Sequence, residues 1–153
     1  MRILQAMAGG KHGGAESFFL RLARSFEQHP AVEQRVLVKN NSVWSEPLRT
    51  DGVQPVELPF GGLFDFTTGT RFRNEVSSFN PDIVLTWMNR ATKYCPSRSP
   101  DQNFVHVARL GGYYDLKYYQ NCDHLVGNTR DIVDYLEREG WPAERAHYLP
   151  NFV

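Results

Sequence analysis

Apolar runs and segments of helical periodicity alternate along the first half of the chain. The run at Arg2 to Met7 predicts a strand, and a glycine-rich loop joins it to a segment whose apolar residues recur at helical spacing. The apolar positions of that segment are Phe18, Phe19, Leu22, Ala23 and Phe26. Further strands are predicted at Val36 to Val38 and at Val53 to Leu58, with a polar connection between them.

The second half of the chain repeats this alternation. Its predicted strands are Ile83 to Thr86, Phe104 to Val107, Leu125 to Val126 and His147 to Leu149. Its predicted helices are Thr70 to Phe79, Asp115 to Asn121 and Asn128 to Gly140, where Asp131 is placed to return a capping-box bond. Strands that alternate with helices and are apolar on both faces predict a doubly wound, Rossmann-like α/β fold, in which helices cover both faces of a parallel sheet. We expect residues 1–153 to form one domain.

Composition narrows the possible partners. Lys plus Arg and Asp plus Glu each number 17, so the formal charge is zero and no overall basic field attracts nucleic acid or an anionic membrane. The two cysteines, Cys95 and Cys122, share no metal-ligand spacing with the histidines, which indicates reduced thiols in a cytoplasmic protein and no metal site. The opening apolar stretch reaches Gly9 too soon for a signal peptide, and no window approaches the roughly 20 apolar residues of a membrane span.

The first candidate site is the loop from Gly9 to Gly14, at the carboxyl end of the first strand. Glycines let a ligand approach the backbone, and free N–H groups at a helix N-terminus suit a phosphate, so Gly13 and Gly14 are candidate contacts. Glu16 is a further candidate, or it merely favours the helix dipole. A tight turn without a ligand explains the glycines equally well. The loop fits neither a dinucleotide fingerprint nor a Walker loop, which needs Ser or Thr where His12 stands.

Trp87, Asn89 and Arg90 follow the strand that ends at Thr86, again at a carboxyl end. An indole beside an amide and a guanidinium offers a platform and hydrogen-bonding groups to a sugar. Alternatively, Trp87 is a core residue and Arg90 a solvated helix residue. For Trp87 taken singly, the core interpretation is the more common outcome.

Arg109 lies at the end of another predicted strand and is placed to meet a phosphate or carboxylate. His106 and Asp115 are candidates for proton transfer, but His106 lies within the strand, where a hydrogen-bonded core histidine is more common. Asn128 follows the strand at Leu125 to Val126. Helix capping explains the segment around Asn128, and a ligand contact is the second interpretation.

Aromatic residues gather in two stretches, Phe60 to Phe66 and Tyr113 to Tyr119. Exposed aromatics in these positions would cover a partner surface or touch a membrane. Core packing explains them at least as well, so the sequence leaves both interpretations open.

Several segments together resemble the amino-terminal domain of bacterial glycosyltransferases of the large retaining family 4, which have the GT-B fold. These segments are Gly13-Gly14-Ala15-Glu16, Pro81-Asp82-Ile83-Val84, Ala108 to Tyr119, Cys122 to Thr129 and Pro150-Asn151-Phe152-Val153. Their order and spacing match along the whole chain. The resemblance implies that residues 1–153 are the acceptor-side domain and that a C-terminal donor-binding domain is absent from this chain.

The resemblance also implies a function, the transfer of a sugar from a nucleotide-sugar donor to a glycan or lipid-linked acceptor. It implies polysaccharide synthesis in the cytoplasm of a bacterium, with peripheral association at the inner face of the membrane, no cofactor and no activity of this chain alone. Gly13, Gly14, Glu16 and Arg109 become candidates for the donor phosphates or the acceptor. The candidates for the acceptor are Trp87, Asn89, Arg90 and Asn128.

The sequence departs from the family in one place. Relatives carry a histidine after the strand that matches Phe104 to Val107, and this sequence has Arg109 there, which makes Arg109 a better candidate contact than His106. The catalytic residues stay unassigned. Two alternatives also stay open: half of a sugar-nucleotide epimerase with the same architecture, and a stand-alone α/β domain that binds a ligand or a partner.

Overall fold

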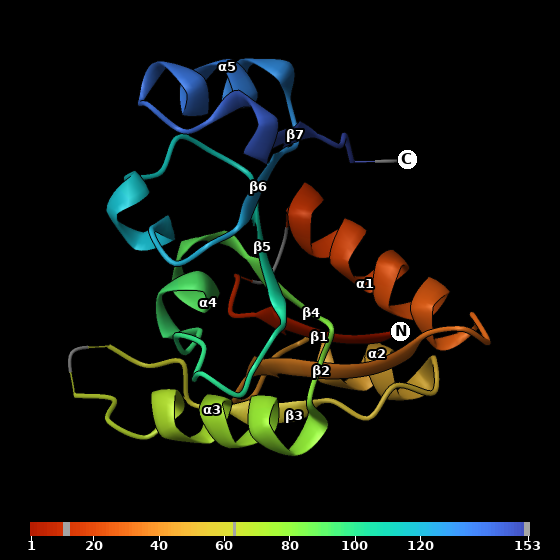
Figure 1. Cartoon of the computed structure of the whole chain (residues 1–153). Helices are drawn as coiled ribbons and strands as arrows, with labels where there is room; N and C mark the ends of the chain where they lie inside the picture. The colour runs from red at the N-terminus through yellow and green to blue at the C-terminus, as the bar shows by residue number, and fades with distance from the viewer. Residues whose placement is uncertain (11–12, 63, 152–153) are drawn as a thin grey trace.

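A computed structural model describes residues 1–10, 13–62 and 64–151, and these residues contain one seven-stranded sheet. The strands are β1 (Arg2–Met7), β2 (Glu33–Lys39), β3 (Val56–Leu58), β4 (Ile83–Trp87), β5 (Val105–Leu110), β6 (His124–Gly127) and β7 (Ala146–Tyr148). Their order across the sheet is β3-β2-β1-β4-β5-β6-β7, and every neighbouring pair is parallel (Figure 1). The predicted parallel sheet is therefore confirmed, and all its carboxyl ends lie at one edge.

The helices pack on both faces of this sheet (Figure 1). They are α1 (Gly14–Glu27), α2 (Ser45–Thr50), α3 (Thr68–Phe79), α4 (Met88–Tyr94) and α5 (Arg130–Arg138), with short 3₁₀ helices η1 (Leu116–Tyr119) and η2 (Ala143–Arg145). Side chains alternate between the two faces along each strand, so Leu4 and Val84 pack with α3 and α4, whereas Met7 and Trp87 pack with α1. The predicted doubly wound α/β fold is confirmed.

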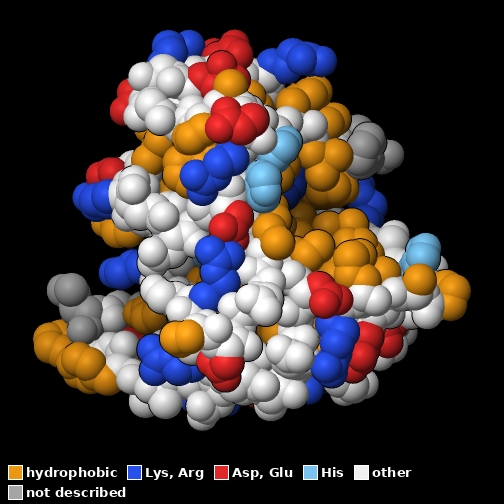
Figure 2. Space-filling view, viewed as in Figure 1, with side chains coloured by type: hydrophobic (Ala, Val, Ile, Leu, Met, Phe, Trp, Pro, Cys, Tyr) orange, Lys and Arg blue, Asp and Glu red, His pale blue; other side chains and the backbone are white. Residues whose placement is uncertain are grey.

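The strand order decides which helix covers which face. A crossover between parallel strands is right-handed, so the steps from β1 to β2 and β3 put α1 and α2 on one face. The later steps run in the opposite direction across the sheet and put α3, α4 and α5 on the other face. Among the described residues, no crossover after α2 returns to the first face, so α1 covers Trp87 and Arg109 there but leaves part of β4 to β6 uncovered. A groove of about 280 Å³ lies there beside α1, and Figure 2 shows hydrophobic side chains along it; they include Phe18, Leu22, Ile83, Leu85, Val107 and Val126.

Two predicted elements are shorter than expected. The third strand is predicted from Val53 but begins at Val56, because Pro55 has no N–H for the ladder, and Val53 packs in the core instead. The helix predicted from Asp115 to Asn121 is only η1. Asp115 caps it by accepting a hydrogen bond from the Lys117 N–H at 2.9 Å.

Two further helices had no predicted bounds, although one interpretation of Arg90 already placed it in a helix. The segment treated as a polar connection forms α2, which accommodates Pro47 because proline is tolerated in the first turn of a helix. The segment after the fourth strand forms α4, in which Arg90 is indeed an exposed helix residue. Both helices are short, so their apolar positions show too few turns for a periodic pattern.

A side chain caps the start of α5, as predicted, but the predicted capping box with Asp131 is wrong. Thr129 Oγ1 accepts a hydrogen bond from the Ile132 N–H at 3.2 Å. A capping box needs Glu or Gln three residues after the cap, and that position is Ile132 here. Asp131, which was expected to return the bond, instead accepts a hydrogen bond from the Tyr113 hydroxyl.

Both cysteines are buried free thiols, in agreement with the predicted reduced state. Burial raises the pKa of the Cys95 thiol well above its usual value and that of Cys122 to about 12. Such thiols stay protonated and unreactive at neutral pH. Among the described residues, no helix combines the length and the apolar character that a membrane span requires.

His106 is a core histidine, as its position within a strand indicated. It lies in β5 with 3% exposure, and its Nε2 is 2.9 Å from Thr86 Oγ1. Its backbone N–H donates to Asp123 Oδ2 at 2.7 Å. Burial lowers the pKa of His106 to about 4, although its contacts with Asn121 and Asp123 act in the opposite direction. This environment keeps the ring neutral and argues against a role in proton transfer at the surface.

We expect acid to destabilise the chain through His106. The pKa in the folded state lies below the usual 6.5, so the unfolded state binds the proton first. Neutral His106 makes its full contribution to the free energy of unfolding above about pH 6.5. This contribution, on the order of 3 kcal/mol, is lost as the pH falls toward 4. Urea unfolding across this window should show a flatter pH profile for His106→Gln, which keeps a polar partner for Thr86. An unchanged profile in the variant would contradict this assignment.

Candidate functional site

The loops after β1, β4, β5 and β6 meet at the carboxyl edge of the sheet. A Cβ placed on Gly9 would lie 2.6 Å from Met88 Cε, which brings the loop after β1 against the end of β4. A Cβ on Gly111, after β5, would lie 3.9 Å from Ala15 Cβ and 4.0 Å from Asn128 Nδ2. Segments that are distant in sequence therefore form one rim, where ligands of open α/β sheets bind.

Glu16 folds back from α1 against the glycine loop and is only 6% exposed. A Cβ on Gly9 would lie 2.8 Å from Glu16 Oε1, and a Cβ on Gly13 would overlap the same carboxylate. The carboxylate thus uses the space that these glycines leave open, and its negative charge in the first turn stabilises the helix dipole. The predicted contact of Glu16 with the donor phosphates or the acceptor stays a prediction, and repulsion between like charges favours a neutral group of the ligand directly on this carboxylate. Lys11 and His12 lie outside the described residues.

The N-terminus of α1 offers backbone donors at this rim. Gly13 is the N-cap, no described side chain caps the helix, and the first helical bond runs from the Ser17 N–H to the Gly13 carbonyl at 3.1 Å. The N–H groups of Gly14 and its two successors precede that bond and have no partner within the helix. Together with the helix dipole, they suit an anion. The assignment of Gly13 and Gly14 to a phosphate stays a prediction.

The step from β4 to α4 contains a conformation that is unusual for a residue with a side chain. Met88 has a φ of 59°, in the left-handed region that favours glycine. Such a conformation persists only where the surroundings enforce it, and it is common at functional sites. It lets α4 begin directly after β4, so that Asn89 and Arg90 lie in the first turn of the helix.

Trp87 does not form the sugar platform that was considered from the sequence. Its side chain is 1% exposed and makes edge-on contacts with Phe18 and Phe19 of α1, at centroid distances of 5.8 and 5.5 Å. Its indole N–H donates to Gln5 Oε1 at 3.2 Å. The side chain of the last residue of β4 points toward α1, so the structure corrects the acceptor assignment in favour of the core interpretation.

Arg109 is also buried, with 3% exposure, and its guanidinium lies over the Phe18 ring at 4.6 Å. Its Nη2 donates to the Leu149 carbonyl at 3.1 Å and to Asn151 Oδ1 at 2.6 Å. Burial lowers the pKa of Arg109 to about 10, which still leaves it charged at neutral pH. The expected contact with phosphate or acceptor is therefore not what this side chain makes here. It fastens the segment after β7 to the sheet.

Asn151 continues this contact to the start of α1. A Cβ on Gly14 would lie 2.8 Å from Asn151 Nδ2, so the amide packs against the glycine. Arg109 on the other side of Asn151 completes a chain of contacts from β5 to the glycine loop. Asn151, which belongs to one of the segments that carry the family resemblance, therefore lies against the start of α1.

Asn89 and Arg90 both line a hollow of about 370 Å³, and their contact with an acceptor stays a prediction. The hollow is lined by Gly61, Gly62, Asn89, Arg90, Lys93, Tyr94 and Tyr118. Asn89 Oδ1 is buried and has no hydrogen-bond partner among the described residues, which is costly unless a ligand or water satisfies it. Arg90 and Lys93 are exposed, so the hollow carries local positive charge on a chain of zero net charge.

Asn128 and Asp115 have different surroundings. Asn128 lies at the rim beside Gly111, and its Oδ1 is buried without a partner in the described part of the chain. Asp115 is paired with Lys117, whose Nζ is 2.7 Å from Asp115 Oδ2. Hydrogen bonds from Lys117 lower the pKa of Asp115, which argues against the considered role of this carboxyl group in proton transfer.

Sequence reasoning missed several residues of the hollow around Asn89. Lys93 follows Arg90 at helical spacing, and a prediction of α4 would have placed both cations on one side of the helix. Tyr94 and Tyr118 gave no such signal. The Tyr94 hydroxyl donates to the Gly61 carbonyl at 3.0 Å, a contact across 33 residues that no local pattern encodes.

The similarity to known proteins covers nearly the whole chain. This chain is similar to lipopolysaccharide core glycosyltransferases. The "Lipopolysaccharide core biosynthesis glycosyltransferase LpsD" of Rhizobium meliloti (strain 1021) is 31% identical over 147 residues, which are 94% of this chain and 41% of LpsD. The chain therefore spans less than half the length of the curated relatives that it matches. No protein-family model matches the chain.

Solved structures share the fold at low identity. The structure of Anabaena HepE in complex with UDP has a TM-score of 0.76 and 14% identity, and the match covers all of this chain and 44% of HepE. The UDP-GlcNAc 2-epimerase from Neisseria meningitidis, bound to UDP-GlcNAc, has a TM-score of 0.68 and 15% identity over 99% of this chain and 46% of the epimerase. The predicted fold class, one Rossmann-like half of a GT-B architecture, is confirmed.

We expect Arg109→Met to loosen the segment after β7. Methionine keeps the apolar stem but removes the donor to the Leu149 carbonyl and to Asn151. The Leu149 N–H, which donates to the Gly127 carbonyl, should then exchange with solvent at least about tenfold faster. Hydrogen exchange followed by NMR measures this, with Arg138→Met on the exposed side of α5 as the matched control. Equal protection of Leu149 in both variants would contradict the fastening role.

Proposed function

We propose that this chain is the acceptor-side domain of a bacterial glycosyltransferase that transfers a sugar from a nucleotide-sugar to a glycan or lipid-linked acceptor. The observation that carries the proposal is the similarity to LpsD along 94% of the chain. The convergence of four loops at one rim of the sheet supports it, because the rim gives a ligand a common place to bind. The finer proposal is a retaining enzyme of family 4 that works at the cytoplasmic side of the membrane.

The proposed donor contact is the N-terminus of α1. The free N–H groups after Gly13 and the helix dipole would stabilise the diphosphate that leaves the sugar, and they need no metal ion from this chain. The Glu16 carboxylate beside them would accept a hydrogen bond from a hydroxyl group rather than bind a phosphate. We propose that a C-terminal domain holds most of the nucleotide-sugar, since the chain spans only 41% of LpsD.

The proposed acceptor contact is the hollow after β4. Asn89 Oδ1, which lacks a partner, would accept a hydrogen bond from an acceptor hydroxyl. Arg90 and Lys93 would bind phosphate or carboxylate groups, which favours an acceptor that carries negative charge. Asn128, at the rim beside Gly111, would contact the acceptor near the start of α1, because Gly111 also approaches Ala15. This arrangement supplies positioning of the acceptor hydroxyl, and the chemistry then needs the second domain.

A sugar-nucleotide epimerase is the second candidate. The fold similarity to the Neisseria meningitidis epimerase favours it, but at 15% identity that similarity concerns the fold alone. An epimerase changes its nucleotide-sugar without an acceptor, whereas a transferase needs one. The hollow around Asn89 offers a place for a ligand besides the N-terminus of α1, which suits a reaction that needs an acceptor as well as a nucleotide-sugar.

The decisive experiment uses a protein in which residues 1–153 are joined to the rest of their reading frame. Candidate nucleotide-sugars are incubated with and without an anionic glycan acceptor, and products are separated by chromatography. We expect sugar transfer only when the acceptor is present, and no transfer by residues 1–153 alone. Conversion of the nucleotide-sugar without an acceptor would favour the epimerase, and turnover by the isolated chain would contradict the division between two domains.

Two substitutions in that longer protein test the acceptor hollow. Arg90→Gln and Lys93→Gln should each raise the KM for an anionic acceptor by about fivefold, because an exposed charge contact contributes about 1 kcal/mol or less. The KM for the nucleotide-sugar should stay unchanged. Arg138→Gln, on the exposed side of α5, is the control for loss of one positive charge. If the KM for the acceptor and the KM for the nucleotide-sugar changed equally, Arg90 and Lys93 would not be contacts of the acceptor.

A further inference from the structure

A further polar hollow lies at the carboxyl edge of the sheet, between the loops that follow β1 and β2. Its volume is about 190 Å³, and it is lined by Gly9, Gly10, Lys39, Asn40, Asn41, Ser42 and Val43. Ligands of open α/β sheets bind beyond this edge. Pockets that enclose a whole drug-sized ligand begin at roughly 300 Å³, so this hollow suits one small unit of a larger ligand.

Hydrogen bonds hold the loop after β2 in place. The Asn40 N–H donates to the Leu58 carbonyl at 2.8 Å, which ties the loop to β3. The Trp44 indole N–H donates to the Gly10 carbonyl at 3.1 Å, which connects the two sides of the hollow. Asn41 has a φ of 56°, in the left-handed region that asparagine tolerates better than most residues. The backbone and the indole of Trp44 thus fix the walls of the hollow.

The polar side chains of this loop keep their binding capacity. Lys39 is partly buried, and no carboxylate in the described part of the chain forms an ion pair with it. The side chains of Asn40 and Asn41 are exposed and make no hydrogen bond with a described residue. The hollow therefore offers one positive charge and two amides, and each amide supplies donors and an acceptor.

Glu57 of β3 lies against the same loop but is engaged by other groups. It accepts a hydrogen bond from the Ser45 hydroxyl at 2.6 Å and another from the Asn41 N–H at 3.3 Å. The hydrogen bond from Ser45 is the main reason that the pKa of Glu57 is lowered. Arg49 Nη2 lies 3.4 Å from Glu57 Oε1 and pairs with its charge. Glu57 therefore leaves Lys39 without a counter-charge.

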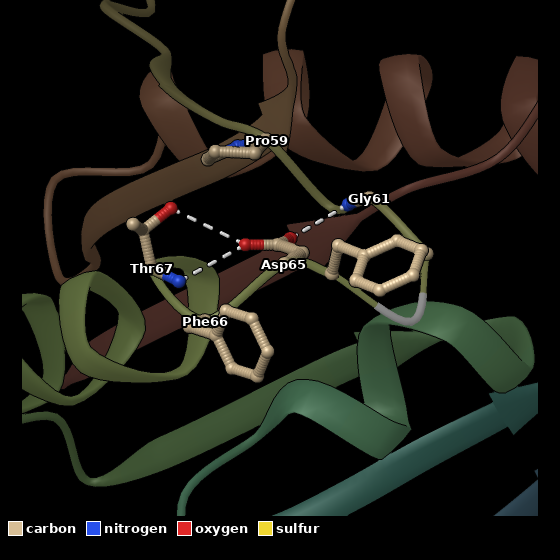
Figure 3. A pocket seen from close by; sticks show the side chains of 7 residues that line it. Pro59, Gly61, Asp65, Phe66 and Thr67 are labelled. Atoms are coloured by element: carbon tan, nitrogen blue, oxygen red, sulfur yellow. Dashed lines mark hydrogen bonds between the residues drawn. The ribbon is translucent and has the colours of Figure 1, made fainter.

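The loop after β3 likewise supplies no counter-charge to the hollow. Its one carboxylate, Asp65, accepts hydrogen bonds from the Gly61 N–H at 2.7 Å and the Thr67 N–H at 3.1 Å. Figure 3 shows this carboxylate between Gly61 and Thr67, with the Phe66 ring directed away from it. Phe64 and Phe66 are 89% and 81% exposed, so the prediction of exposed aromatics in this stretch holds for these two rings.

The hollow after β2 is next to the proposed acceptor contact. Gly9 lines it, and a Cβ on Gly9 would lie 2.6 Å from Met88 Cε. Met88 immediately precedes Asn89, whose Oδ1 has no partner among the described residues and is the proposed contact for an acceptor hydroxyl. An acceptor of two units therefore reaches both hollows along the rim.

We propose that Lys39, Asn40 and Asn41 bind a sugar unit of the acceptor that carries an anionic group, next to the unit in the hollow after β4. The lysine ammonium would bind a phosphate or carboxylate, and the two amides would exchange hydrogen bonds with sugar hydroxyls. This inference rests on the proposed sugar transfer. It makes the acceptor a glycan of at least two units and places a determinant of its specificity in the loop after β2.

An NMR titration of the Asn40 and Asn41 side-chain amides tests the hollow on residues 1–153. The probes are glucose-6-phosphate, glucuronate, glucose and inorganic phosphate. We expect millimolar binding of the two anionic sugars and about fivefold weaker binding of glucose and of phosphate, because each of these lacks either the charge or the hydroxyl groups. Of the two anionic sugars, the one that binds more tightly identifies the anionic group as phosphate or carboxylate.

Two substitutions separate the charge from the amide. Lys39→Gln should weaken binding of the anionic sugars about fivefold and leave that of glucose unchanged, because only the charge is lost. Asn41→Gly should weaken binding of all three sugars about fivefold, since glycine keeps the left-handed backbone and removes the amide. Asn80→Gly, at the left-handed end of α3, and Arg138→Gln, on the exposed side of α5, are the matched controls and should bind like the unchanged chain.

The inference is overturned if the two amides respond to neither anionic sugar, or if inorganic phosphate binds as tightly as these sugars do. It is also overturned if either substitution in the loop behaves like its control. Thermal unfolding establishes that each variant is folded. No nucleotide-sugar is present, so a loop that binds none of the sugars leaves the sugar-transfer experiment standing. Conversely, sugar binding by this loop without any transfer in the longer protein would contradict the proposed function alone.

Discussion

Parallel pairing of all seven strands, with right-handed crossovers, is the constraint on which the rest of this structure depends. It forces every strand to point its carboxyl end to the same edge, so four loops that are far apart in sequence become neighbours. The close approach of Gly9 to Met88 and that of Gly111 to Ala15 and Asn128 are consequences of it. The hydrogen bonds of the sheet thus determine where the candidate site lies, and the loops supply the side chains that line it.

Two buried charged side chains, Glu16 and Arg109, hold segments of this rim in place. Glu16 places a carboxylate against the glycine loop, and Arg109 places a guanidinium between the Phe18 ring and the segment after β7. The Arg109 guanidinium is not free for a ligand as the sequence suggested, and both groups determine the shape of the place where a ligand would bind. Through Asn151, the chain that leaves β7 packs on Gly14, the first residue of α1.

The same topology distributes apolar surface unevenly. Because the steps toward β7 all run one way, α3, α4 and α5 cover one face while the α1 side of β4 to β6 keeps a half-buried groove. A second apolar surface, the tip with Phe64 and Phe66, arises for another reason, since the Asp65 network holds those rings out of the core. The two apolar surfaces lie on different parts of the molecule, and their exposure has different structural causes.

The sequence by itself determined the fold class, most strands and the longer helices, because apolar periodicity reports which sides of an element are buried. It also indicated the core position of His106 and the ends of strands where a site would form. Only the tertiary structure decided the direction of each side chain at that edge. Trp87 and Arg109 point toward α1, whereas Asn89 faces the hollow around Arg90. A shift of one residue along a strand moves a side chain to the opposite face of the sheet. No local sequence pattern records which of these faces a helix from elsewhere in the chain will cover.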